Sequence, residues 1–436
     1  MVVEPVDPVQ GCHLDGRSVR PGSSPPDDLG FVDAAAKVGI VPLKRTTAVL
    51  NQIYRRPIMS DRSIIKFESD MEIGFYLICR LLGSCGRETV GKNVGKYSEF
   101  TDGFWSSFVQ TYMDQMVGPS ISSRSQELDL ASNLHPLVLR HSQALLQLNR
   151  RRNGKLRDEA IDLASKLNAV DLVPILLKGG AGLVSGLYSD AGARVMSGLD
   201  VLVPRSLSGK CEQVMADMGY HRAPKVPHPR EKLIGVFSHR DLLASIDLHG
   251  EVMEYPNQNV LTAQEVIAES EILTVAGARL GVPSITHQIV NNVAHAQLND
   301  HAMVFGQFPL RALHDFSLMV NSAPDRIDWE WICARFAAEG RSSELAFHCL
   351  AASRLMGTPV PAGVMPSRAT NLLYRRAEYQ VSRPGLQKYG SRVLRPLMLL
   401  RRELSDPALR IRLLRNIFNP AWWRRHLGFV WGGRRN

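Results

Sequence analysis

The segment ILLKGGAGLVSGLYSDAGARVMSGLDVLVP, from Ile175 to Pro204, decides the fold. Its first residues continue an apolar run over 173–177 that is typical of a buried strand, and the run ends in two glycines. A short helix follows, and a second apolar strand is predicted over 199–203. Upstream, the apolar spacing over 155–171 predicts a helix that leads into the first strand.

The turn Lys178-Gly179-Gly180 joins the first strand to the helix. Glycines at such a turn let backbone N–H groups approach an anion, and the following helix directs its positive end to the same place. The turn therefore predicts a phosphate site. The spacing matches neither of the common glycine-rich nucleotide motifs, so a simple tight connection stays open as the alternative.

The second strand carries a single carboxylate, Asp200. Because side chains alternate along a strand, Leu199 and Val201 face one side and Asp200 faces the other with Gly198. Two aspartates two positions apart would put both carboxylates on one face, where they can hold a pair of metal ions. Gly198 stands where the partner would be. Alone, an aspartate such as Asp200 is more often a cap, a turn partner or a member of a salt bridge.

A further strand is predicted near 244–248, within the stretch SIDLHGEV. Asp247 and His249 share one face of it by the same alternation. A carboxylate on a neighbouring strand could complete a metal site with Asp200. His249 could also line a cleft with His295 and His314, although buried histidines are more often structural.

The composition is that of an ordinary globular protein, with 436 residues and 44% hydrophobic content, enough for two or three domains. No apolar run approaches the roughly 18 residues that cross a bilayer, and the first thirty residues lack a secretory signal, which predicts a cytoplasmic location. Six cysteines without CxxC spacing argue against a disulfide framework and a cysteine zinc site.

The net charge of +10 belongs to the C-terminus. The segment 388–436 has twelve Lys or Arg residues and two acidic ones, and the rest of the chain is neutral. Arginine pairs stand beside tryptophans in AWWRRHLGFVWGGRR. This tail predicts contact with an anionic membrane surface, which would make the protein peripheral, or with a nucleic acid or other polyanion. A solvated or packed tail is the third interpretation.

Downstream, the pattern predicts a hairpin over 272–283 that turns at Ala276-Gly277, and a helix that begins after Ser284. His287 and His295 would lie more than roughly 10 Å apart on that helix, too far to share one metal. The chain is thus divided into a loosely packed segment 1–60, a helical lead-in 61–154, a core 155–283, a helical domain 284–384 and a basic tail 385–436.

The order LLKGG, GARVMSGLDVLVP, IDLHGEV, SITHQIVNNVAHAQL and LRALHDF resembles the uncharacterised nucleotidyltransferase family of bacteria, relatives of the DNA polymerase β superfamily. The resemblance covers about 158–320. It implies an α+β fold with a nucleotidyltransferase-like mixed β-sheet core, flanked by helical N- and C-terminal regions. It also implies Mg2+-dependent transfer of a nucleoside monophosphate from an NTP to an unidentified hydroxyl or phosphate acceptor.

Carried over by position, Gly179 and Gly180 match the turn that binds the nucleotide phosphates. Asp200 and Asp247 match the second and third carboxylates, which are catalytic and hold Mg2+. Lys178 and Arg194 match basic positions that approach the triphosphate.

The first aspartate of the family's pair is replaced by Gly198, which puts catalysis in doubt. Asp190, in the preceding loop, is the one nearby acid that could substitute. The alternative is therefore a catalytically silent member that binds a nucleotide or a partner. A DNA- or RNA-binding regulator that acts through the basic tail is a third class.

Overall fold

The computed structural model describes residues 70–83, 100–223, 232–242 and 245–383, with a few single positions between 385 and 419. The segment 1–60 and nearly all of the basic tail 385–436 lie outside the described residues, so the predictions for them are not tested by the structure. Within the described parts, every helix is too short or too polar to span a membrane.

A seven-stranded sheet forms the centre of the described residues, in the order β3-β4-β5-β2-β1-β7-β6. The strands are β1 (Ile175–Leu176), β2 (Gly198–Leu202), β3 (His221–Arg222), β4 (Leu233–Ser238), β5 (Ser245–His249), β6 (Glu271–Val275) and β7 (Ala278–Val282). β2 is parallel to β5 and antiparallel to β1, whereas β1 is parallel to β7. The sheet is therefore mixed, and the predicted α+β fold is confirmed.

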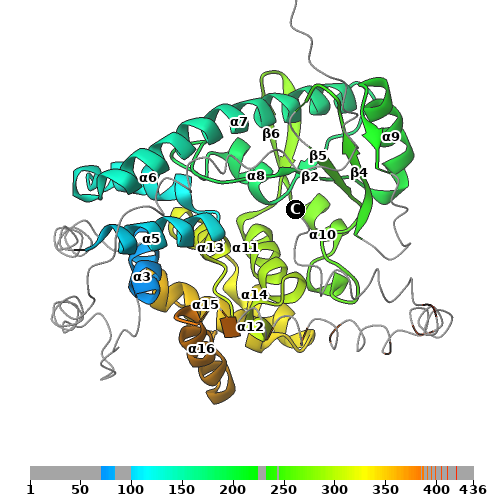
Figure 1. Ribbon diagram of the computed structural model, residues 1–436. Helices are drawn as coiled ribbons and strands as arrows, with labels where there is room; N and C mark the ends of the chain where they lie inside the picture. The colour runs from blue at the N-terminus through cyan, green and yellow to red at the C-terminus, as the bar shows by residue number, and fades with distance from the viewer. Residues whose placement is uncertain are drawn as a thin grey trace, which may run out of the picture. The chain divides into compact units, whose positions relative to one another are not determined.

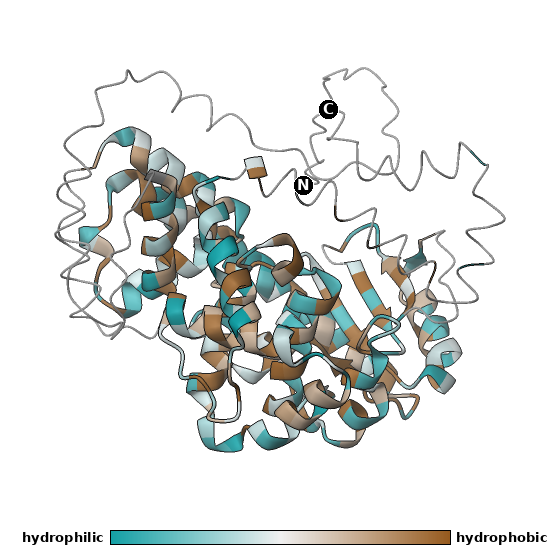
Figure 2. Ribbon diagram, turned by 90° about the horizontal axis from the view of Figure 1, so that it is seen from below, coloured by the Kyte–Doolittle hydropathy of each residue, from teal (hydrophilic) through white to brown (hydrophobic). Residues whose placement is uncertain are grey.

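Helices lie on both sides of this sheet (Figure 1). They are α3 (Asp70–Leu82), α5 (Asp102–Asp114), α6 (Gly118–Glu127), α7 (Pro136–Asn168), α8 (Lys178–Ser185), α9 (Ser208–Asp217), α10 (Ala263–Ala268), α11 (Ile285–Ala294), α12 (Ala302–Phe305), α13 (Leu310–Ser322), α14 (Trp329–Ala338), α15 (Ser342–Met356) and α16 (Arg368–Val381). Hydrophobic and hydrophilic residues alternate along their ribbons, as expected for helices that each cover a core (Figure 2).

Two hydrophobic cores flank the sheet. One lies between the sheet and helices α7 and α9, and includes Leu163, Leu199, Val201 and Ile246. The other joins the opposite face, through Ile175 and other residues, to the helices that precede α7 and follow the sheet. Because Leu199 and Val201 are buried in the first core, the alternation along β2 turns Asp200 to the opposite face, as predicted.

Most predicted elements occur close to their expected bounds. The first strand is shorter than predicted, with only Ile175–Leu176 paired in the sheet, and β4 was not predicted. The hairpin of β6 and β7 turns at Ala276 and Gly277, both with positive φ (49° and 83°). Ser284 caps α11 by accepting a hydrogen bond from the backbone N–H of His287.

Three helical predictions need correction. The predicted helical lead-in 61–154 is interrupted between α6, which ends at Glu127, and α7, which begins at Pro136. α7 then runs for 33 residues and passes through the predicted boundary at 154–155 without a break. The helix after Ser284 ends at Ala294, where a π-helical turn, His295–Asn299, replaces its predicted last turn.

Candidate functional site

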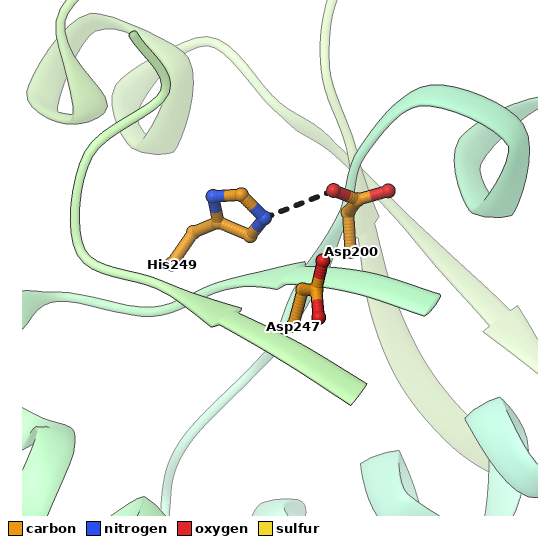
Figure 3. A group of neighbouring side chains, drawn as sticks. All are labelled: Asp200, Asp247 and His249. Atoms are coloured by element: carbon orange, nitrogen blue, oxygen red, sulfur yellow. Dashed lines mark hydrogen bonds and ion pairs between the residues drawn. The ribbon is translucent and has the colours of Figure 1, made fainter. Parts of the chain in front are cut away.

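The carboxylates of Asp200 and Asp247 lie side by side on the sheet. β2 and β5 are parallel, and their register pairs Asp200 with Asp247. Since directly paired residues project to the same face of a sheet, both side chains point away from the core under α7. One ligand atom from each of Asp200, Asp247 and His249 can be chosen so that all three lie within 4.8 Å of one another (Figure 3). The structure thus brings the two predicted metal ligands together.

His249 belongs to this cluster, although the sequence suggested for it a place in a cleft and not among the metal ligands. It lies two residues after Asp247 on β5, is 1% exposed, and its Nε2 donates to Asp200 Oδ1 at 2.9 Å (Figure 3). Burial lowers the pKa of His249 in spite of the carboxylate, so the ring is neutral near pH 7. Strand alternation had already predicted that His249 shares a face with Asp247.

Lys178 contacts the same carboxylate oxygen as His249. Its ammonium Nζ lies 2.5 Å from Asp200 Oδ1, and the backbone N–H of Leu177 donates to the Asp200 carbonyl at 2.9 Å. Lys178 has a φ of +50°, a left-handed conformation that is unfavourable for a residue with a Cβ. Such a conformation persists only where the surrounding structure holds it.

These contacts shift the pKa values of the two carboxyl groups in opposite directions. Burial opposes ionisation of Asp200, but the hydrogen bond from His249 and the charge of Lys178 outweigh it and hold its pKa well below the ordinary value. Burial, followed by the negative charge of Asp200, raises the pKa of Asp247. Asp200 is therefore held as a carboxylate by direct partners. Asp247 has no direct partner among the described residues, and the charges of His249, Lys178 and Lys232 only partly offset its raised pKa.

The predicted phosphate turn begins helix α8. The N–H of Gly180 already donates to the Leu177 carbonyl at 3.1 Å, so the helix start can offer an anion only the backbone donors of Lys178 and Gly179. A Cβ on Gly179 would lie 2.3 Å from Arg194 Nη1, whereas a Cβ on Gly180 would make only ordinary contacts. A side chain at 179 would have to displace the Arg194 guanidinium or the Met196 side chain, so the glycine lets the guanidinium approach the backbone.

Arg194 is ion-paired and mostly buried. Its Nε donates to Asp315 Oδ2 at 2.8 Å, and the hydroxyl of Tyr188 donates to the other oxygen of Asp315 at 3.0 Å. Burial opposes the charge of Arg194, but Asp315 and Tyr188 keep the pKa of Arg194 above its ordinary value. One edge of the guanidinium is thus anchored to α13, while Nη1 lies beside Gly179 at the start of α8.

The loop that carries Arg194 is tied to helix α7 by side-chain amides. Asn149 Nδ2 donates to the carbonyls of Gly192 and Arg194 at 2.6 and 2.7 Å. Asn153 Nδ2 donates to the carbonyls of Ala191 and Arg194 at 2.6 and 2.9 Å. The loop between α8 and β2 therefore takes its conformation from α7.

A second lysine, Lys232, lies at the site just before β4. Its backbone carbonyl accepts hydrogen bonds from the N–H groups of Gly250 and Glu251, at 2.8 and 3.2 Å, immediately after β5. Burial and the charge of Lys178 lower its pKa, and both site carboxylates oppose this change. A single lysine before an unpredicted strand gave no signal in the sequence.

Gly198 leaves no room for the missing carboxylate. It pairs with Ser245 across the parallel strands, and a Cβ at this position would lie 2.3 Å from the Ser245 carbonyl oxygen. Asp190 does not substitute, because it pairs with Arg150 and accepts from the backbone N–H of Gly192 at 2.8 Å.

The other histidines have partners of their own. His287 lies 3.4 Å from Glu269, and His295 Nδ1 lies 3.2 Å from Asp300 Oδ2, which agrees with the prediction that they do not share a metal. His314 is buried, and its Nδ1 lies 3.1 Å from the Leu82 carbonyl, which is a structural contact.

The donor set fits one divalent cation. Among the described residues, Asp200 Oδ2 and both oxygens of Asp247 have no hydrogen-bond or ion-pair partner, and carboxylate oxygens are the ligands that Mg2+ prefers. His249 is better suited to orienting Asp200, because nitrogen ligands favour other metals. The bridging carboxylate that a two-ion arrangement requires is absent at Gly198.

Comparison with known proteins identifies one family. The model of a family described as "Uncharacterised nucleotidyltransferase" matches residues 102–357, which is more than half of the chain. A search of curated proteins found no match.

Solved structures give weaker likenesses. The solution structure of the antibiotic-resistance factor ANT(2″)-Ia shares 13% identity at a TM-score of 0.31, covering 44% of this chain and 96% of that chain. Its crystal structure with adenylyl-2″-tobramycin shares 13% identity at a TM-score of 0.29, and the match covers 40% of this chain and 91% of that chain. An antigenic nucleotidyltransferase-like protein from Paracoccidioides brasiliensis shares 13% identity at a TM-score of 0.34, and the match covers 49% of this chain and 97% of that chain. The family assignment therefore rests on the family match alone.

Proposed function

The chain belongs to the uncharacterised nucleotidyltransferase family, and on this premise we propose that it transfers a nucleoside monophosphate from an NTP to a hydroxyl or phosphate acceptor, with Mg2+ as cofactor. The observation that carries the proposal is the pairing of Asp200 with Asp247 on adjacent parallel strands. The two carboxylates face away from the hydrophobic core beside a glycine-containing helix start. This combination is suited to a metal-bound triphosphate.

Asp200 and Asp247 would hold the cation. Bound there, a divalent ion would neutralise charge that develops on the transferred phosphoryl group. Asp200 is kept ionised by Lys178 and His249, so it can bind a metal without first losing a proton. Asp247, whose pKa is raised by burial and by Asp200, would gain a directly bound positive charge.

The start of α8 would bind the phosphates. Backbone donors of Lys178 and Gly179, the positive end of the helix and the Arg194 guanidinium beside Gly179 together favour an anion. Gly180 would act by shaping this turn. The base of the nucleotide and the acceptor are not specified by these residues.

A second candidate function, nucleotide binding without transfer, is favoured by one observation. The position of the family's first aspartate is Gly198, and the main chain of Ser245 occupies the space that a side chain would need. A site with two carboxylates can still bind a metal–nucleotide complex, but it is less able to activate an acceptor hydroxyl.

Titration calorimetry with Mg-ATP and Mg-CTP, followed by a pyrophosphate-release assay, separates the candidates. Active transfer predicts binding and pyrophosphate release by the wild type, both lost in Asp200→Asn and retained in the control Asp158→Asn on the exposed face of α7. Binding without release would support the silent member. Absence of binding to either nucleotide would contradict both candidates.

For the basic tail, contact with an anionic membrane or a polyanion stays a prediction from the sequence. A chain that ends at Ser382 should lose binding to anionic vesicles or to nucleic acid, if either occurs, and this binding should weaken steeply with salt. Equal binding by the full and shortened chains would contradict the prediction.

A further inference from the structure

Two lysines lie close to the two carboxylates. Lys178 lies 2.5 Å from Asp200, and Lys232 is close enough for both Asp200 and Asp247 to affect its pKa. Lys232 is 8% exposed, and its ammonium lies 3.9 Å from Glu254, which is a weak contact. Two buried or half-buried cations therefore face the same space as the two carboxylates.

A second divalent ion has no comparable place. Two-ion phosphoryl-transfer sites use a carboxylate that contacts both ions. In this chain Gly198 occupies the position of that carboxylate, and a Cβ added there would lie 2.3 Å from the Ser245 carbonyl oxygen. Of the two oxygens of Asp200, Oδ1 is taken by Lys178 and His249, which leaves Oδ2 for a metal.

We propose that this site binds one divalent cation with its nucleotide, and that the Lys178 ammonium takes the place of the second cation. The inference rests on the proposed function, because it concerns how the same site compensates the charge of a triphosphate. A lysine ammonium is a compact charge that commonly binds phosphate groups. The Lys178 ammonium contacts Asp200, and the same residue begins the helix of the proposed phosphate turn.

Lys178 then has opposite effects on two ligands. In the free protein its ammonium repels a metal ion bound at Asp200 Oδ2. When a nucleotide is bound, the same charge attracts the phosphates. Removing the charge should therefore strengthen metal binding and weaken nucleotide binding, whereas a lysine that only supports the fold would affect both ligands in the same direction.

The first measurement is stoichiometry in the wild-type chain. Equilibrium dialysis against Mn2+ with α,β-methylene-ATP, and separately with α,β-methylene-CTP, measures both ligands bound per chain at saturation. One Mn2+ per bound nucleotide is expected. Two Mn2+ per bound nucleotide would overturn the inference and leave the proposed function intact. Absence of bound nucleotide would overturn the proposed function and the inference with it.

The second measurement compares Lys178→Met with Lys210→Met, a control on the exposed surface of α9. Without nucleotide, Lys178→Met should bind Mn2+ about tenfold more tightly than the wild type, because a charge at this distance is strongly felt. It should bind α,β-methylene-ATP at least about tenfold more weakly. Lys210→Met should match the wild type. Weaker or unchanged binding of both ligands by Lys178→Met would overturn the inference, and the stoichiometry decides it if this variant does not fold.

Discussion

Gly198 and Ser245 face each other across β2 and β5 so closely that no side chain fits between them. The glycine is therefore a requirement of strand packing as well as a missing metal ligand. The strands come together at this point because the residue has no Cβ. Restoring an aspartate here would have to move backbone, since the atom that it meets is a main-chain oxygen.

We expect Gly198→Asp to destabilise the protein without restoring a two-ion site. Overpacking of this kind typically costs ~1–3 kcal/mol in the free energy of unfolding. Urea denaturation should show a similar loss for Gly198→Ala, because the Cβ alone makes the contact. A stable Gly198→Asp variant that releases pyrophosphate faster than the wild type would contradict this explanation.

Replacing Asp247 should increase stability while it removes metal binding. Its carboxylate is half-buried and is repelled by Asp200, so Asp247→Asn relieves an unfavourable charge in the metal-free protein. We expect the free energy of unfolding to rise by ~0.5–1 kcal/mol, as is common when a functional group is removed. Mn2+ binding should fall at least about tenfold. Asp200→Asn is the matched comparison, and it should destabilise because Lys178 loses its partner.

The pair of Arg194 and Asp315 should contribute strongly to stability. Both side chains are largely buried, and removing one partner of a buried pair leaves an uncompensated charge. Asp315→Asn and Arg194→Met should each cost ~3–5 kcal/mol in the free energy of unfolding. The double variant should cost clearly less than the sum of the two. Additive losses in this double-mutant cycle would show that the two side chains do not interact energetically.

Stability should fall as the pH decreases from about 6.5 to about 4. Burial lowers the pKa of His314 to about 4 and that of His348 to about 3. In this range the unfolded chain takes up protons that the folded chain does not. Each histidine therefore lowers the free energy of unfolding by about 1.4 kcal/mol for each pH unit of decrease.

Chemical denaturation at several pH values measures this slope. His348→Gln should reduce the slope by about one proton's contribution. His221→Gln, at an exposed position in β3, is the control and should leave it unchanged. An equal slope in the wild type and His348→Gln would contradict the assignment.

The positions of Asp200 and Asp247 could be predicted because strand alternation is a local property. Each aspartate interrupts an apolar pattern with period two, and the pattern alone decides which face it occupies. The turn at Ala276-Gly277 and the cap at Ser284 are local for the same reason. Such features depend on neighbouring residues in the chain, which the sequence displays directly.

The contacts of Lys178 and Arg194 could not be predicted in this way. Lys178 reaches Asp200 across 22 positions of the chain, and Arg194 reaches Asp315 across 121. The sequence assigned both cations to a nucleotide but did not reveal their carboxylate partners. The close approach of Ser245 to Gly198 depends in the same way on how two distant strands pair. Helix α7 continues through Gly154 because tertiary packing outweighs the weak helix propensity of one glycine.

The amides of Asn149 and Asn153 on α7 have a consequence for how quickly and tightly a ligand can bind. They hold the carbonyls of Gly192 and Arg194, so the loop beside the phosphate turn is ordered when the protein folds. Ordering a loop upon binding costs affinity and slows association. A nucleotide that enters this site would meet the loop between α8 and β2 in a conformation that is already ordered, so binding need not pay the entropy cost of ordering it. We therefore expect its association rate to be limited by encounter and desolvation and not by a rearrangement of this loop.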